Sequence, residues 1–469
     1  MEGAINENSQ TGKKRKHPKG LFLLFITEMW ERYSYYGMRS ILVLYLTAEL
    51  ISGGLGMDKE SALMLYGLYT GLVYFTPLIG GYLTDRLMGL RTAITIGGIT
   101  MAAGDFTLFA VQEQWGLYLG LLLLIIGNGF FKPNISTLVG ELYDKNDPRK
   151  DSAFTIFYMG INLGALISPL VAGLIYATWF HDTTANGIEV FGFKYAFLAS
   201  SIGMIIGQVT FNSLSKKYLG DVGVKPAATM ATPEDRKNAA PLTKHEKHRT
   251  AVILILACFT VMFWAGFEQA GASFTLYTRD FVDRTVFGYE IPVSFFQSLN
   301  PLFILLLAPV VSALWYKLSR TKRGDFSIPT KMSFGLILLG LGFMVMVPAV
   351  MITGSDESAA VQVSMLFMIV TYLLHTLGEL SLSPIGLSLV SKMSPVKIAS
   401  LLMGVWFLSN AAANYMAGYI ASLTTEFGYL EIFTYLGIAA FALGLVLLAL
   451  SKPLQKLMHV DEIDNSSRV

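Results

Sequence analysis

The sequence predicts an all-α membrane protein with twelve transmembrane helices in two six-helix bundles, and three observations carry this prediction. Of the 469 residues, 53% are hydrophobic and only 14% are charged, whereas soluble domains carry roughly 25% charged residues. Predominantly apolar segments of the length that a helix needs to cross a bilayer recur along the whole chain. A membrane barrel would instead show alternating segments of about ten residues, so the spans are predicted to be helices.

Six apolar segments precede a long polar stretch and six follow it. They cover residues 21–50, 61–84, 92–111, 115–143, 152–178, 195–214, 251–277, 294–318, 330–352, 361–390, 398–423 and 432–450. The predicted domains are an N-terminal tail (1–20), an N-terminal bundle (21–215), a linker (216–249), a C-terminal bundle (250–452) and a C-terminal tail (453–469). The polar linker is interpreted as a solvated tether.

The distribution of basic residues predicts the orientation of the chain. If the N-terminus lies inside, 28 of the 35 Lys and Arg residues fall in cytoplasmic segments and four fall in outer loops. Short loops rich in Lys and Arg stay on the cytoplasmic side. We therefore expect a multi-pass protein of the plasma (inner) membrane with both termini in the cytoplasm.

Several classes of function are excluded by what the sequence lacks. A net charge of +2 without a continuous basic face argues against a nucleic-acid partner. The chain has no Gly-x-x-x-x-Gly-Lys-Ser/Thr phosphate loop and no nucleophile or metal constellation, so we expect no enzyme activity and no cofactor. Secondary transport with protons as the coupling ion is the class of function that remains. The lipid bilayer is the expected surrounding of the chain, and no obligatory protein partner is evident.

Charged residues inside the predicted spans are the strongest functional signal. A charge at mid-bilayer costs at least about 2.5 to 3.5 kcal/mol, so each one suggests a functional site. In the first span the charges and Tyr35 and Tyr36 recur at helical spacing and form one polar stripe. The seven charges are Glu28, Glu31, Arg32, Arg39, Lys132, Glu268 and Glu379. The alternative, that they only hold helices together, is weaker because buried ion pairs stabilise poorly.

Three further residues in the spans each have two alternative interpretations. Asp105 in the third span and His375 in the tenth are interpreted as local hydrogen-bonding partners or as residues near a span end, although His375 shares a helix face with Glu379. Trp406 is either an anchor at the membrane interface or a wall of a cavity.

The motifs around these charges resemble a known family. Residues 81–91, beginning Gly-Tyr-Leu-Thr-Asp-Arg, resemble the loop between helices two and three of the major facilitator superfamily. The first-span sequence Glu28-Met29-Trp30-Glu31-Arg32 resembles the Glu-x-x-Glu-Arg signature of the proton-dependent oligopeptide transporters (POT/PTR), whose bacterial members are symporters of protons with di- and tripeptides. Residues 130–136, 154–162, 267–269 and 378–384 resemble later motifs of that family.

The resemblance implies a role for each matching residue. Glu28, Glu31 and Arg32 would couple transport to protons. Arg39 and Lys132 would hold the peptide carboxylate, and Glu379 would hold its ammonium group. The remaining substrate contacts implied are Tyr35, Tyr36, Tyr74, Asn162, Asn300 and Trp406. The linker is too short and polar for the two extra helices that many bacterial members carry between the bundles.

These roles form a hypothesis of alternating access. Burial favours a neutral carboxyl group and a nearby guanidinium favours the charged one, so Glu28 or Glu31 beside Arg32 is predicted to titrate. Arg39 with Glu268 would close the outer side, and Lys132 with Glu379 the inner side. The predicted function is import of di- and tripeptides with protons. The alternatives are a proton-coupled carrier of a drug, nitrate or another anion on the same fold, and a peptide sensor that does not transport.

Overall fold

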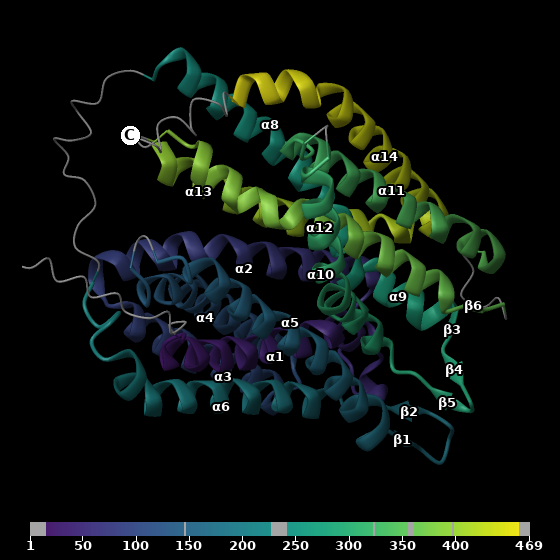
Figure 1. The fold of residues 1–469 in the computed structure, drawn as a ribbon. Helices are drawn as coiled ribbons and strands as arrows, with labels where there is room; N and C mark the ends of the chain where they lie inside the picture. The colour runs from purple at the N-terminus through teal and green to yellow at the C-terminus, as the bar shows by residue number, and fades with distance from the viewer. Residues whose placement is uncertain are drawn as a thin grey trace, which may run out of the picture.

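The chain folds into two helical bundles that lie side by side, and each has its own apolar core (Figure 1). This computed structural model describes residues 16–144, 147–226, 242–321, 324–354, 361–395 and 398–458, with the backbone alone at 383–389, 391, 392, 399 and 400. Large parts of the predicted tails and linker, at 1–15, 227–241 and 459–469, lie outside the described residues.

The N-terminal bundle contains the first six long helices. They are α1 (Lys19–Thr47), α2 (Lys59–Leu87), α3 (Leu90–Ala110), α4 (Gln114–Glu141), α5 (Lys150–Leu174), which continues into η2 (Ile175–Trp179), and α6 (Phe193–Leu219). The connections hold the short helix η1 (Leu50–Ser52) and an antiparallel pair of strands, β1 (Asp182–Thr183) and β2 (Glu189–Val190).

The C-terminal bundle contains six further spans, two of which are built from consecutive helices. The first joins α8 (Lys244–Phe267), η3 (Glu268–Gly271) and α9 (Ser273–Phe281), and the second joins η4 (Val293–Ser298) and α10 (Leu299–Ser319). The others are α11 (Ile328–Thr353), α12 (Leu366–Met393), α13 (Ala399–Ser422) and α14 (Thr424–Met458). Two small pairs of strands join β3 (Val282–Asp283) to β6 (Val363–Ser364) and β4 (Thr285–Val286) to β5 (Tyr289–Glu290).

The prediction of twelve helical spans is confirmed, because each predicted apolar segment coincides with one span of the described chain. By length and apolar composition alone, nine spans of the described chain qualify. The other three are α1, which carries five charged side chains, α12, whose fully described apolar part is the shorter stretch Leu366–Leu382, and α13, which carries Asn410 and Asn414. In α1 and α13 these polar residues lower the mean hydropathy of the span.

Local sequence explains where two of the helices begin. The side chain of Asp58 accepts a hydrogen bond from the Ser61 backbone N–H at 2.8 Å and so caps α2. The same hydrogen bond holds the pKa of the Asp58 carboxyl below its usual range. Thr243 and Glu246 form a reciprocal capping box at the start of α8. The helix therefore begins at Lys244, inside the segment predicted as the linker (216–249).

The bundles touch at one end of the molecule, which we call the closed end. Near the start of α2 and the end of α13, Gly67 packs directly on Gly418, and a Cβ atom added at Gly418 would lie 2.4 Å from the Gly67 Cα. Ser298 Oγ donates to the Leu166 carbonyl of α5 at 2.8 Å, which adds a second interbundle contact there. In Figure 1 the ribbons of the bundles lie together on the right, where the strands are, and apart on the left.

Candidate functional site

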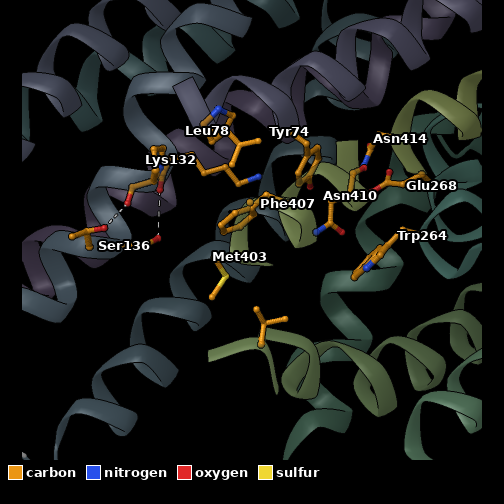
Figure 2. Close-up of a pocket in the computed structure, with 15 residues that line it drawn as sticks. Tyr74, Leu78, Lys132, Ser136, Trp264, Glu268, Met403, Phe407, Asn410 and Asn414 are labelled. Atoms are coloured by element: carbon orange, nitrogen blue, oxygen red, sulfur yellow. Dashed lines mark hydrogen bonds between the residues drawn. The ribbon is translucent and has the colours of Figure 1, made fainter. Parts of the chain in front are cut away.

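Two adjoining cavities lie between the bundles. The larger, about 770 Å³, is reached from the opposite end, which we call the open end, because its lining includes the last turns of α4 and α12 and the first turns of α13. The smaller, about 170 Å³, lies deeper. Tyr74, Trp264 and Glu268 line both cavities, so the two adjoin and are described together as one site. Figure 2 shows Tyr74 and Lys132 on one side of the larger cavity and Trp264 and Glu268 on the other.

An ion pair between Arg39 of α1 and Glu268 of η3 joins the two bundles at the inner boundary of the site. Arg39 Nε also donates to the Tyr66 hydroxyl of α2 at 2.6 Å. All three side chains are buried, so the charges compensate each other where water is scarce. Gly271 permits this approach, since a Cβ atom there would lie 1.9 Å from the Tyr66 hydroxyl.

The Glu-x-x-Glu-Arg stripe forms a second charged cluster inside the N-terminal bundle. Arg32 Nη2 donates to Glu31 Oε1 at 2.7 Å, and its Nε also pairs with Glu31 and lies 3.1 Å from Glu28 Oε1. Asn128 of α4 donates to Glu31 Oε1 at 3.4 Å. All three charged residues of the stripe are at most 3% exposed. Two carboxylates share one guanidinium here, so one negative charge is in excess when both ionise.

Lys132 and Glu379 are not paired with each other in the described part of the chain. The Lys132 ammonium faces the larger cavity and lies 3.8 Å from the centre of the Tyr74 ring. Glu379 faces the smaller cavity and accepts a hydrogen bond from Asn300 Nδ2 at 2.8 Å. The two side chains are therefore apart in this structure, in which the bundles are separated at the open end. A cation from one bundle and a carboxylate from the other line the walls of the site.

The remaining predicted substrate contacts separate into two groups. Tyr36, Tyr74, Asn162 and Asn300 all line the smaller cavity together with Arg39 and Glu379. Tyr35 and Trp406 are buried, and among the described residues neither lines either cavity. The structure thus brings most of the predicted residues to one place and leaves these two aromatic side chains behind its walls.

Some residues of the site were not predicted from the sequence. Trp264 lines both cavities, Asn410 and Asn414 line the larger one, and Tyr66 holds Arg39. A signal for the asparagines was available, because two amides one helical turn apart in an apolar span suggest a polar face. Trp264 offered no such signal, since an aromatic residue in a span is ordinarily core or lipid-facing.

Asp105 and His375 lie away from both cavities. Asp105 is fully buried and accepts a hydrogen bond from the Ser34 hydroxyl at 2.5 Å. The ring of His375 approaches the Leu339 carbonyl at 3.2 Å and is enclosed by Phe343 and Phe274, with ring centroids at 5.0 and 5.8 Å. Both residues therefore make local hydrogen bonds.

The site offers separated charges of opposite sign on the walls of two adjoining cavities of about 770 and 170 Å³. Cations come from Arg39 and Lys132, and a carboxylate comes from Glu379, while tyrosine hydroxyls and asparagine amides supply neutral hydrogen-bonding groups. Within the described ranges, no group of three His, Cys, Asp or Glu side chains is placed to hold a metal ion. Such a site suits a small molecule that carries both a cationic and an anionic end.

Comparisons with known proteins agree over nearly the whole chain. The family model PTR2, described as the POT family, matches residues 91–219 and 235–441. The uncharacterized transporter YclF of Bacillus subtilis (strain 168) is 36% identical, covering 94% of this chain and 95% of its own length. The peptide transporter YePEPT of Yersinia enterocolitica is 32% identical over 94% and 96%. A mutant of a peptide transporter POT, solved in complex with alafosfalin, has a TM-score of 0.85 at 34% identity and covers 96% of this chain and 97% of that one.

Proposed function

This chain belongs to the POT family of membrane transporters, which have the major facilitator fold, and on that premise we propose that it imports di- and tripeptides together with protons. Relatives that are similar over nearly their full length are peptide transporters. The observation that carries the proposal is the placement of Arg39 and Lys132 of one bundle and Glu379 of the other on the walls of two adjoining cavities.

A peptide has the charge pattern that this cavity matches. Every unmodified di- or tripeptide has an ammonium group at one end and a carboxylate at the other, whatever its side chains. Lys132 and Arg39 attract the carboxylate, Glu379 attracts the ammonium group, and Tyr36, Tyr74, Asn162 and Asn300 bind the peptide backbone. Recognition of the two ends leaves the side chains free to vary, so the substrate class is broad.

Proton coupling belongs to the stripe on α1. Glu28 and Glu31 share Arg32, so protonation of either carboxylate frees part of the guanidinium for other partners. One proton that enters down 100 mV contributes about 2.3 kcal/mol, which corresponds to roughly 50-fold accumulation. Protons are the only coupling partner the proposal needs.

Two interbundle pairs act as alternate gates in this proposal. The Arg39–Glu268 pair holds the closed end together. Lys132 and Glu379 stand apart on the walls of the larger and the smaller cavity, and they come together when the opposite face opens. A bound peptide competes for the same charges, which links occupancy of the cavity to the change in conformation.

The membrane orientation follows the charge of the loops. The chain resides in the plasma (inner) membrane with both termini in the cytoplasm, and the open end faces the cytoplasm. The predicted domains (1–20, 21–215, 216–249, 250–452 and 453–469) then become a cytoplasmic tail, a bundle, a cytoplasmic linker, a second bundle and a second cytoplasmic tail. The asymmetry of Lys and Arg between the two sets of loops supports this orientation.

A transport assay decides between peptide import and its alternatives. Purified protein in liposomes, with an imposed inward proton gradient and an inside-negative potential, should accumulate labelled dialanine. A carrier of another solute would leave dialanine outside, and a peptide sensor would bind it without uptake. Dialanine blocked at both ends serves as the matched control, because it lacks both charges and should not compete.

A further inference from the structure

Asp105 is a buried carboxyl group that the proposed transport cycle does not use. It lies on α3, its side chain is 0% exposed, and its Oδ2 is 2.5 Å from the Ser34 hydroxyl of α1. Its Oδ1 has no hydrogen-bond partner within the described residues. A buried carboxyl oxygen without a partner is costly, so its presence requires an explanation beyond packing.

No cation compensates Asp105 in the part of the chain that the structure describes. Glu31 of α1 and Tyr69 of α2 are the titratable groups whose charges act on Asp105, and the parts of α4 and α6 that pack beside it, at residues 120–124 and at Ser201, carry no charged side chain. An ionised Asp105 would therefore be a buried charge next to a second carboxylate. Like charges at such a site disfavour each other, so the two carboxyl groups do not ionise independently.

Ser34 connects Asp105 to the polar stripe of α1. It follows Glu31 by three residues and therefore lies on a neighbouring position of the same helix surface. Buried oxygens of Tyr69 and Asn128 are also without a hydrogen-bond partner among the described residues, and Asn128 itself donates to Glu31. Asn128 of α4 thus contacts Glu31, and Ser34 of α1 contacts Asp105.

From this arrangement we infer that Asp105 is a second proton-binding site of the N-terminal bundle, coupled to Glu31 through their charges and adjoining it through Ser34. Glu31 is paired with Arg32 and ionises first, so its negative charge holds the proton on Asp105 more firmly. The Ser34 hydroxyl donates to the Asp105 carboxylate and makes its ionised form accessible. The charge of Glu31 thereby sets the pH at which Asp105 releases its proton. This inference rests on the proposed proton coupling.

Infrared spectroscopy tests the site without any transport. The purified protein in liposomes is titrated with pH, and difference spectra are recorded for the wild type and for Asp105→Asn. The asparagine keeps the shape of the side chain and remains neutral at every pH. We expect the variant to lose a carboxyl band that titrates in the wild type. Identical difference spectra would mean that Asp105 never exchanges a proton, which would overturn the inference.

The same infrared titration of Glu31→Gln tests the coupling. Without the negative charge of Glu31, Asp105 loses its proton at lower pH, so the midpoint of the Asp105 carboxyl band should move down by about one pH unit in Glu31→Gln. Ser34→Ala removes the hydrogen bond that favours the ionised form, so the band should titrate at higher pH in this variant.

Ser201→Ala is the matched control, since it removes a buried hydrogen bond of 2.9 Å to the Ala102 carbonyl of α3 without touching a titratable group. An unmoved midpoint of the Asp105 band in Glu31→Gln, as in the control, would show that the two carboxyl groups are not coupled and would overturn the inference. Absence of uptake by the wild type would instead contradict the proposed function, while the infrared titration would still decide whether Asp105 binds a proton.

Discussion

The two bundles differ in how they use polar groups inside the membrane. Five of the seven intramembrane charges lie in the N-terminal bundle, and three of them, Glu28, Glu31 and Arg32, form a cluster of their own. In the C-terminal bundle Glu268 and Glu379 face the cavities, and the buried ring of His375 is enclosed by aromatic side chains. This difference fits the proposed division of labour, in which one bundle would handle the proton and both bundles would bind the substrate.

The largest effect is expected from a substitution in the cluster proposed to couple transport to protons. Glu31→Gln keeps the side-chain shape and removes the exchangeable proton, so the accumulation ratio of dialanine should fall from roughly 50 at 100 mV to about 1. Counterflow of peptide without a gradient should persist, because the cavity is untouched. The measurement is uptake into liposomes with and without a gradient, and Glu431→Gln, at an exposed glutamate, is the control. Full gradient-driven accumulation by Glu31→Gln would contradict the assignment.

The second largest effect is expected from a substitution at the proposed substrate site of the C-terminal bundle. Glu379→Gln removes the carboxylate proposed to bind the peptide ammonium group, and loss of such a buried charged partner should weaken binding by about 2 kcal/mol, or roughly 30-fold. A binding titration with dialanine measures the change. N-acetylated dialanine lacks the ammonium group, so the substitution should alter its affinity far less. An equal loss for both ligands would assign Glu379 to the shape of the cavity and not to the ammonium group.

A third change tests the contact between the bundles. Gly418→Ala places a methyl group against the Gly67 backbone, so the closed end should separate. Gly404→Ala is the matched control on the same helix, because its Cβ would meet only Leu78 Cδ2 at 4.0 Å. Distances between spin labels across the closed end, in a Cys258→Ser background that removes the single native cysteine, should lengthen in Gly418→Ala alone. Unchanged distances in both variants would show that this contact does not limit opening.

The smallest effect is expected at His375, one helical turn from Glu379. His375→Phe removes one hydrogen bond to the Leu339 carbonyl and fits the surrounding aromatic rings, so stability should fall by about 1 kcal/mol. The pH profile of uptake should stay that of the wild type. Thermal unfolding in detergent and the uptake profile together check this expectation, and a shifted profile would place His375 among the titrating groups.

Much of the fold followed from the sequence because its signals are local. Each predicted span became a helix, since an apolar run long enough to cross the bilayer satisfies its backbone groups internally only as a helix. The breaks within the spans were not predicted. The turn Glu268–Gly271 interrupts the seventh span where Gly271 lets Tyr66 and Arg39 approach, and that approach involves helices far apart in the chain.

The candidate site, like the fold, was predictable from the sequence only in part. The cost of a charge in the membrane is a property of one residue in its span, so the sequence by itself predicted Glu31, Arg39, Lys132 and Glu379 as candidate site residues. Which of them meet depends on distances between helices and on the relative position of the two bundles. Only the tertiary structure therefore decided that Arg39 pairs with Glu268 while Lys132 and Glu379 stand apart, and that Asp105 lies against Ser34 on the helix that carries Glu28, Glu31 and Arg32.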